Sequence, residues 1–255
     1  MVNAHSLLAL AQLTTGSIGI IAALPEEAAV LTRKKLQKGE CCRLAENSHL
    51  ALSGAGAANA AAAAESLIAQ GATLLISWGC AAGLAADVNP GDLVLAASVL
   101  SATGEEYLAD QSALAALRAQ LPAGLTVNQG AILESRVIVA LSRDKLNLQQ
   151  QTGAVALDME SAAVFAAAAQ ANLPCIAVRA IADPLGLNLP SAVATALNAD
   201  GQIVFSRLFT DLVQRPWQIP ALIKLGLNFN AAVKTLKQVA VGLTDGLTGQ
   251  VSQEN

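Results

Sequence analysis

The chain has 255 residues, of which 54% are apolar but only 3% aromatic, and its formal net charge at neutral pH is −4. A phosphate backbone is held by clustered positive charge, and the basic run at 33–35 is too short to provide it, which argues against nucleic acid as a partner. The length suits one large domain whose core is built from small aliphatic side chains.

The cysteines and the first residues indicate the cellular environment that we expect for the protein. Cys41, Cys42, Cys80 and Cys175 show neither the spacing of zinc ligands nor a disulfide framework, so we expect no metal and a reducing, cytoplasmic environment. The opening segment has a short apolar patch at 7–10 but no positively charged start. We therefore expect an ordinary leader into the fold, and no transmembrane segment.

Continuous apolar runs alternate with alanine-rich stretches along the chain. The runs lie at 17–27, 72–84, 91–100 and 173–184 and are bounded by Gly or Pro, as is typical of strands buried on both faces. The alanine-rich stretches at 57–69 and 161–171 end near Gly or Pro and predict helices. This alternation predicts an α/β fold with a parallel or mixed sheet.

The C-terminal part differs in composition. Pro216 and Pro220 precede a pattern of apolar residues at three- and four-residue steps, with lysines on the other side. We expect a single domain over 1–240, with a helical extension at about 203–240 and a flexible tail at 241–255. The extension has two interpretations, packing on its own domain or a partner subunit, and peripheral contact with a membrane.

A glycine-rich turn, "SGAGAANAAAAA", begins at Ser53 and leads into a predicted helix. Backbone N–H groups at such a turn can hold a phosphate. As a dinucleotide fingerprint the turn is incomplete, because Asn59 stands where a third glycine belongs. A nicotinamide-dependent enzyme is therefore a weaker alternative.

Carboxylates stand where the predicted strands end. Glu26 and Glu27 close the first run after "IGIIAALP", and Asp183 follows "CIAVRAIA" in the last one. Asp158 and Glu160 follow "TGAVAL". Because ligands of open α/β sheets bind beyond the C-terminal ends of the strands, these side chains can converge on one small molecule. Helix capping is the alternative, since each also lies near the start of a helix.

Five motifs follow one another along residues 17–186: "IGIIAALPEEAAVL", "SGAGAANA", "SWGCAAGLAADVNPGDLVLA", "ALDMESAAV" and "VRAIADP". In order and spacing they resemble the nucleoside phosphorylase and nucleosidase family, whose members cleave the N-glycosidic bond of purine nucleosides. The resemblance implies a three-layer α/β fold with a mixed, largely buried central sheet flanked by helices. It also implies an enzyme that is a homo-oligomer and has no cofactor.

Within this family the chain is most similar to the hopanoid-associated branch, through "LPEEA", "DMESAAV" and the tail "RPWQIPALIKLG". That resemblance implies cleavage of a 5′-substituted adenosine, adenosylhopane, with release of adenine in hopanoid biosynthesis. A nucleosidase for methylthioadenosine and adenosylhomocysteine is one alternative. A noncatalytic nucleoside- or lipid-binding protein is another.

The resemblance assigns roles to individual residues. Glu27 would position and deprotonate the attacking water, and Asp183 would protonate purine N7 as the base leaves. Met159 would lie against the sugar, with Glu160 on its 2′ and 3′ hydroxyls, a task that suits a carboxylate because it accepts two hydrogen bonds at once. Core packing is the alternative for Met159, and an ordinary first-turn glutamate is the alternative for Glu27.

The chain also departs from the family pattern. Cys80 occupies the place of a serine that contacts water or phosphate in relatives, and it is a weaker hydrogen-bonding group. The acceptor therefore stays open between water and phosphate, the latter as a co-substrate held by Ser53, the backbone of Gly54 and Gly56, and Arg179. Arg179 would stabilise negative charge near the nucleophile, or it would brace the loop. Where many relatives stack an aromatic ring on the purine, this chain has three aliphatic residues, Val137, Ile138 and Val139.

Overall fold

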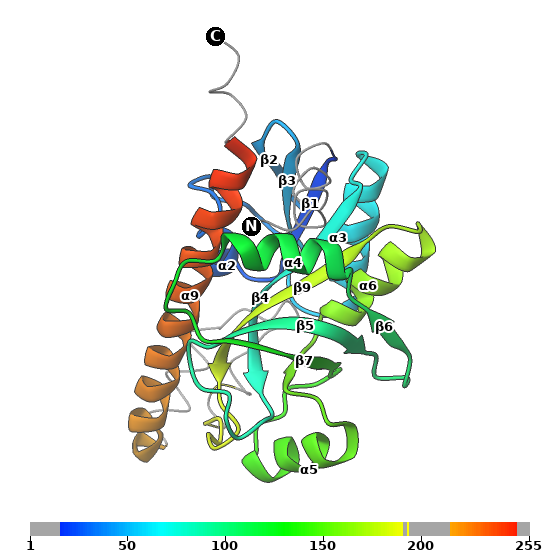
Figure 1. Ribbon diagram of the computed structural model, residues 1–255. Coiled ribbons are helices and arrows are strands. Elements are labelled where there is room, and N and C mark those ends of the chain that lie inside the picture. Colours follow the sequence, from blue (N-terminus) through cyan, green and yellow to red (C-terminus); the bar gives the residue numbers. More distant parts are fainter. Residues whose placement is uncertain (1–15, 191–192, 194–214, 249–255) are drawn as a thin grey trace.

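The computed structural model describes residues 16–190, 193 and 215–248, and in it strands alternate with helices (Figure 1). In chain order the elements are β1 (Ile18–Ala22), α2 (Pro25–Ala28), β2 (Cys41–Ala45), β3 (Ser48–Leu52), α3 (Ala57–Ala69), β4 (Leu74–Gly83), β5 (Leu93–Leu100), β6 (Glu106–Leu108), α4 (Gln111–Gln120), β7 (Val127–Glu134), α5 (Ser142–Thr152), β8 (Ala156–Asp158), α6 (Ser161–Gln170), β9 (Cys175–Asp183), the 3-10 helix η1 (Pro216–Gln218) and α9 (Ile219–Thr248). The expected leader lies outside the described residues.

The strands of this part of the chain form one mixed sheet in the order β2-β3-β1-β4-β8-β7-β5-β6, and β9 pairs with both β4 and β5. β1 lies parallel to β3 and β4, and β9 lies parallel to β4 but antiparallel to β5. Because β9 bridges two strands that are already linked through β8 and β7, the middle of the sheet closes into a ring. The four predicted apolar runs contain β1, β4, β5 and β9, so these strands are confirmed.

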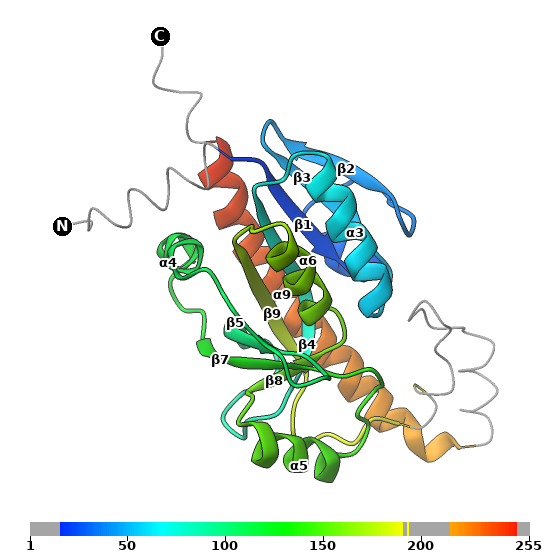
Figure 2. The ribbon, with the colours of Figure 1, turned by 90° about the vertical axis from the view of Figure 1, so that its right-hand side faces the viewer.

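Helices cover both faces of the sheet, which confirms the expected fold class. Figure 2 shows α6 in front of β9 and β4, with α9 behind them. α3 and α6 pack against each other, and their buried positions include Ala60, Ala64 and Ala168. Alanine lets two helix backbones approach closely, so the alanine-rich composition is explained by this helix layer.

The C-terminal helix α9 packs along β9 through Ala232, Leu236 and Val239, which are fully buried. Thr235 adds a hydrogen bond from its hydroxyl to the carbonyl oxygen of Gly91 at 2.6 Å. The helix therefore packs on its own domain, and it ends later than predicted, since helical backbone continues past residue 240 to Thr248. Residues 203–214 of the expected extension lie outside the described part.

The described helices are too short or too polar to cross a bilayer. None of them combines the length and the apolar character that a membrane-crossing helix needs.

Candidate active site

A cavity of about 290 Å³ lies where β1, β4, β8 and β9 end. Its wall is mostly apolar, and it brings together many of the residues that the sequence singled out. These are Glu27, Cys80, Val137, Ile138, Val139, Met159, Glu160 and Asp183. Segments that are far apart in the chain thus meet at one edge of the sheet, as expected for an α/β fold.

Glu27 is held rigidly from three sides. It lies in the third position of α2 and is only 3% exposed. Its Oε2 accepts hydrogen bonds from the backbone N–H groups of Ala23 and Leu24 at 3.2 and 3.0 Å, and its Oε1 accepts one from the N–H of Cys80 at 2.8 Å. Burial raises the pKa of Glu27, although the charge of Arg179 and these hydrogen bonds oppose the rise.

The approach of Glu27 to strand β4 depends on Gly79. A β-carbon at this position would lie 2.6 Å from Glu27 Oε1, too close for any side chain. On the other side, the indole N–H of Trp78 donates to the backbone oxygen of Glu27 at 3.3 Å. β4 therefore positions this carboxylate through Gly79, which leaves room for it, and through the buried indole of Trp78.

Cys80 lines the same cavity beside Glu27. Burial, and then the neighbouring charge of Glu27, raise the pKa of its thiol well above the usual value. The thiol therefore stays protonated, and the backbone N–H of Cys80 also donates to Glu27.

Glu160 stands at the start of α6 and is linked to the glycine-rich turn. Its Oε1 accepts a hydrogen bond from the N–H of Gly56 at 2.8 Å, and its Oε2 accepts a long one from the N–H of Met159 at 3.3 Å. Burial, and then the charge of Asp158, raise the pKa of Glu160 to about 7. Each of its oxygens keeps a lone pair for a ligand.

A buried network behind Glu160 explains the other acid of "ALDMESAAV", Asp158. Asp158 forms an ion pair with Arg179 at 2.7 Å, and it accepts hydrogen bonds from the backbone N–H and the hydroxyl of Ser161. Arg179 also donates to the hydroxyls of Ser77 and Ser161 at 2.8 and 3.1 Å. Asp158 therefore caps α6 and neutralises Arg179, and both support the segment that carries Glu160.

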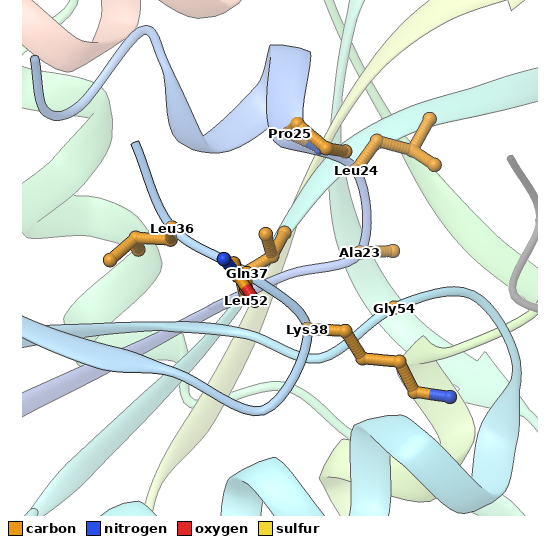
Figure 3. Close-up of a pocket in the computed structure, with 8 residues that line it drawn as sticks. All are labelled: Ala23, Leu24, Pro25, Leu36, Gln37, Lys38, Leu52 and Gly54. Atoms are coloured by element: carbon orange, nitrogen blue, oxygen red, sulfur yellow. The ribbon is translucent and has the colours of Figure 1, made fainter. Parts of the chain in front are cut away.

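The residues expected to hold a phosphate do not gather in the cavity. Arg179 is 2% exposed and lies in the network behind the wall. The hydroxyl of Ser53 points to the backbone oxygens of Ala22 and Gly54. Gly54 lines a neighbouring pocket of about 390 Å³, where Figure 3 shows Lys38 extending past it.

Asp183 lies at the end of β9 and lines the cavity. A register shift between Ala81 and Ala82 places it opposite Ala82 of β4. Its Oδ1 lies 2.7 Å from the ammonium of Lys145. Burial raises the pKa of Asp183, and the charge of Lys145 opposes that rise.

Lys145 is a member of the site that the sequence did not indicate. It lies within "SRDKLNLQQQ", a polar stretch in which a lysine is expected to face solvent. In the structure it is completely buried in α5. Only the packing of α5 on the segment after β9 reveals it.

The three aliphatic residues proposed to hold the base form the rim of the cavity. Val137 and Ile138 are 68% and 38% exposed, whereas Val139 packs into the small cluster around Leu157. They lie between β7 and α5 and offer a flat base an apolar surface without an aromatic ring.

The chain is similar to known proteins that share this fold. The family model described as the phosphorylase superfamily matches residues 17–210. A 5′-methylthioadenosine/S-adenosylhomocysteine nucleosidase of Oceanobacillus iheyensis is 28% identical over 200 residues, which cover 67% of this chain and 87% of that protein.

Solved structures share the fold. A 5′-methylthioadenosine/S-adenosylhomocysteine nucleosidase from Neisseria meningitidis, in complex with methylthio-immucillin-A, has a TM-score of 0.68 at 20% identity, covering 90% of this chain and 98% of that one. Futalosine hydrolase of Helicobacter pylori has a TM-score of 0.64 at 17% identity, covering 92% and 98%. Since the family match spans most of its length, the chain belongs to the phosphorylase superfamily.

Proposed function

We propose that the protein is an enzyme that hydrolyses the N-glycosidic bond of a 5′-substituted adenosine and releases adenine. The observation that carries this proposal is the convergence of Glu27, Glu160 and Asp183 in one mostly apolar cavity, each in a different environment. Carboxylates with separated environments take separate roles in acid and base chemistry. The superfamily and the nucleosidases that resemble the chain support this class of reaction.

Glu27 is the proposed base. Its carboxylate is fixed by three backbone N–H groups and faces the cavity beside Cys80. A base is most effective when its pKa lies near the working pH, and burial shifts Glu27 in that direction. It takes a proton from water as the water oxygen bonds to C1′ of the ribose.

Glu160 and Met159 are the proposed ribose site. The N–H groups of Gly56 and Met159 orient the carboxylate of Glu160, and the free lone pairs accept the 2′ and 3′ hydroxyls. Met159 supplies an apolar surface for the sugar.

Asp183 is the proposed acid. As the bond between C1′ and N9 breaks, its electron pair moves into the purine ring, and N7 takes the proton of Asp183. Without that proton an adenine anion and a cationic sugar would have to separate in a cavity that is poor in water. Over one turnover Glu27 gains a proton and Asp183 loses one, and exchange with solvent restores both.

Water is the acceptor that fits this site. Phosphate sites combine positive side chains with several backbone N–H groups. Among the described residues, no lysine or arginine lines the cavity, and the carboxylate of Glu27 would repel a phosphate placed beside it. Phosphate as a co-substrate is therefore the weaker alternative.

Two classes of 5′ substituent are candidates. The relatives whose names include methylthioadenosine and adenosylhomocysteine support a small thioether substituent. Adenosylhopane is the second candidate, supported by exposed apolar side chains on η1, on the first turns of α9 and on the rim of the cavity. These are Val137, Ile138, Trp217, Ile219, Ile223 and Leu227. Figures 1 and 2 place the start of α9 and α5 at the same end of the molecule.

The decisive variant is Asp183→Asn, assayed by mass spectrometry with methylthioadenosine, adenosylhomocysteine, adenosine and adenosylhopane, each with and without phosphate. We expect wild-type protein to give adenine and free sugar without phosphate, and the variant to lose at least about a hundredfold in kcat. Asp87→Asn, at an exposed aspartate, is the matched control.

Other outcomes would contradict the proposal. Full turnover by Asp183→Asn would remove the proposed acid. A sugar phosphate among the products would show that phosphate, and not water, is the acceptor. Nucleoside binding without any adenine release would identify a binding protein instead.

A further inference from the structure

Lys145 is the buried charge that the proposed mechanism has not yet used. It lies in the first half of α5, its side chain is completely inaccessible, and its ammonium meets three oxygen atoms. Asp183 Oδ1 lies at 2.7 Å, and the backbone oxygens of Pro184 and Leu187 each accept a hydrogen bond at 3.1 Å. An ammonium has three protons, so two serve the backbone oxygens and one remains on the side of the ion-paired carboxylate.

The position of this ammonium is fixed by the surrounding backbone. The N–H of Ser142 donates to the side-chain oxygen of Asn188 at 2.7 Å, and the N–H of Leu189 donates to the carbonyl of Ala140 at 2.8 Å. The start of α5 is therefore tied to the segment that follows β9. Lys145 cannot shift without losing hydrogen bonds to that segment, which also follows directly from Asp183.

A buried lysine is costly unless it is paired, so its presence here calls for an explanation. A methionine or leucine would fill the same space without the cost of desolvating a charge. The pairing of Lys145 with Asp183, a residue of the cavity wall, links this cost to the site.

Building on the proposed function, we infer that Lys145 is the positioning residue of the acid. It holds Oδ1 of Asp183 so that Oδ2 is left for the leaving base, and its ammonium balances the carboxylate that remains once the proton has moved to the base. Lys145 itself does not touch the substrate. It acts through Asp183 and through the backbone of Pro184 and Leu187.

The charge of Lys145 affects the pH at which Asp183 loses its proton. Among the described residues the charge that acts on Asp183 is that of Lys145. The other titratable side chains that line the cavity are Glu27, Cys80, Asp158 and Glu160, and they interact with one another and with Arg179. Burial raises the pKa of Asp183 and Lys145 lowers it. Removal of Lys145 therefore raises that pKa further, and the proton persists to higher pH.

The test compares Lys145→Met and Lys145→Gln with wild type. Both variants lose the charge, and Lys145→Gln keeps hydrogen-bond donors for the two backbone oxygens. We expect the alkaline limb of the kcat profile to move up by about one pH unit or more, since a nearby opposite charge lowers a carboxyl pKa by about 1–3 units. We also expect kcat at the optimum to fall about tenfold or more, with KM changed much less.

A second measurement does not require turnover. The carboxyl carbon of Asp183, followed by NMR, should titrate at higher pH in both variants, whether or not the protein releases adenine. Arg143→Met removes an exposed cation from the same helix and should leave both readouts unchanged.

The outcomes separate the two proposals. Unchanged titration of Asp183 in folded Lys145→Met overturns the inference about Lys145. A shifted titration with kcat reduced only in proportion to the loss of folded protein, checked by circular dichroism, overturns the positioning role. Loss of the proposed function itself appears as a wild-type protein that releases no adenine, while the NMR comparison still reports on Lys145.

Discussion

In Glu160, the charge needed for the proposed binding of ribose lowers the stability of the folded protein. Burial, and then the charge of Asp158, raise its pKa from 4.5 to about 7, so the folded protein binds the proton more tightly than the unfolded chain does. A raised carboxyl pKa contributes stability that is fully present below pH 4.5 and is lost as the pH rises through about 7. The ionised form that grips a ribose is thus the form that costs stability.

Glu160→Gln should therefore stabilise the protein at alkaline pH. The shift in pKa corresponds to roughly 3 kcal/mol, so at pH 8 the free energy of unfolding of the variant should exceed that of wild type by up to this amount. Below pH 4.5, where Glu160 is neutral in both states, the difference should vanish. Urea unfolding across pH measures it, and turnover should be lost.

The control for this prediction is Glu65→Gln, on the exposed side of α3. Its unfolding free energy should follow wild type at every pH. A Glu160→Gln protein that is less stable than wild type at pH 8 would show that the carboxylate is stabilised rather than strained by its surroundings.

Single residues also show what the sequence cannot reveal. The carboxylates at strand ends could be predicted, because they lie beside apolar runs with Gly or Pro boundaries. Lys145 could not, because nothing in a polar helix shows which side chain will be covered. The sequence leaves two roles open for Arg179, at the nucleophile and in bracing the loop. It lies in the network with Asp158 and Ser161, a pairing that depends on distant segments meeting.

Among the elements, β4 contributes most to the arrangement of the site. It pairs with β1 on one side and β9 on the other, and its second half carries Gly79 and Cys80 against Glu27. The long apolar run predicted this strand correctly. The role of Gly79 is different, because it depends on a contact with α2 that no local pattern encodes.

Gly79→Ala tests this contact. The new methyl group would lie 2.6 Å from Glu27 Oε1, so the carboxylate has to move and loses its hydrogen bond from Cys80. We expect kcat to fall about a hundredfold or more, in line with the loss of a general base. KM should change little because the proposed ribose site at Glu160 is untouched.

The matched change is Gly226→Ala in α9, where a β-carbon would meet nothing within 4 Å. It should stabilise the helix by up to about 1 kcal/mol and leave kinetics unchanged. Wild-type kcat in Gly79→Ala would mean that Glu27 tolerates displacement and is not the base.

The whole molecule presents an apolar stripe at the end that holds the cavity. Ile219, Ile223 and Leu227 recur at four-residue steps on α9 and are 43%, 59% and 64% exposed, with Trp217 close by in the sequence at 71%. The opposite face of the helix is buried on β9. The amphipathic pattern predicted one buried face, but the position and exposure of the second could only be seen in the folded chain.

The double variant Ile223→Asp/Leu227→Asp tests whether this stripe binds lipid. If the 5′ substituent is a hopane, wild-type protein should cosediment with phosphatidylcholine vesicles that contain an anionic lipid, and the variant should lose at least about tenfold in partitioning. Turnover of methylthioadenosine should not change. Equal partitioning of the two proteins would favour the small thioether substrates.

Because β9 closes the ring of strands, the active site can form only late in the synthesis and folding of the chain. β9 pairs with β4, for example Cys175 with Leu75, and with β5, so its partners precede it by about 80 to 100 residues in the chain. Contacts over such distances form late, because the cost of closing a long loop precedes the gain. Glu27 and Asp183 can therefore share a cavity only after synthesis has passed β9, and a nascent chain stopped before that strand has no active site.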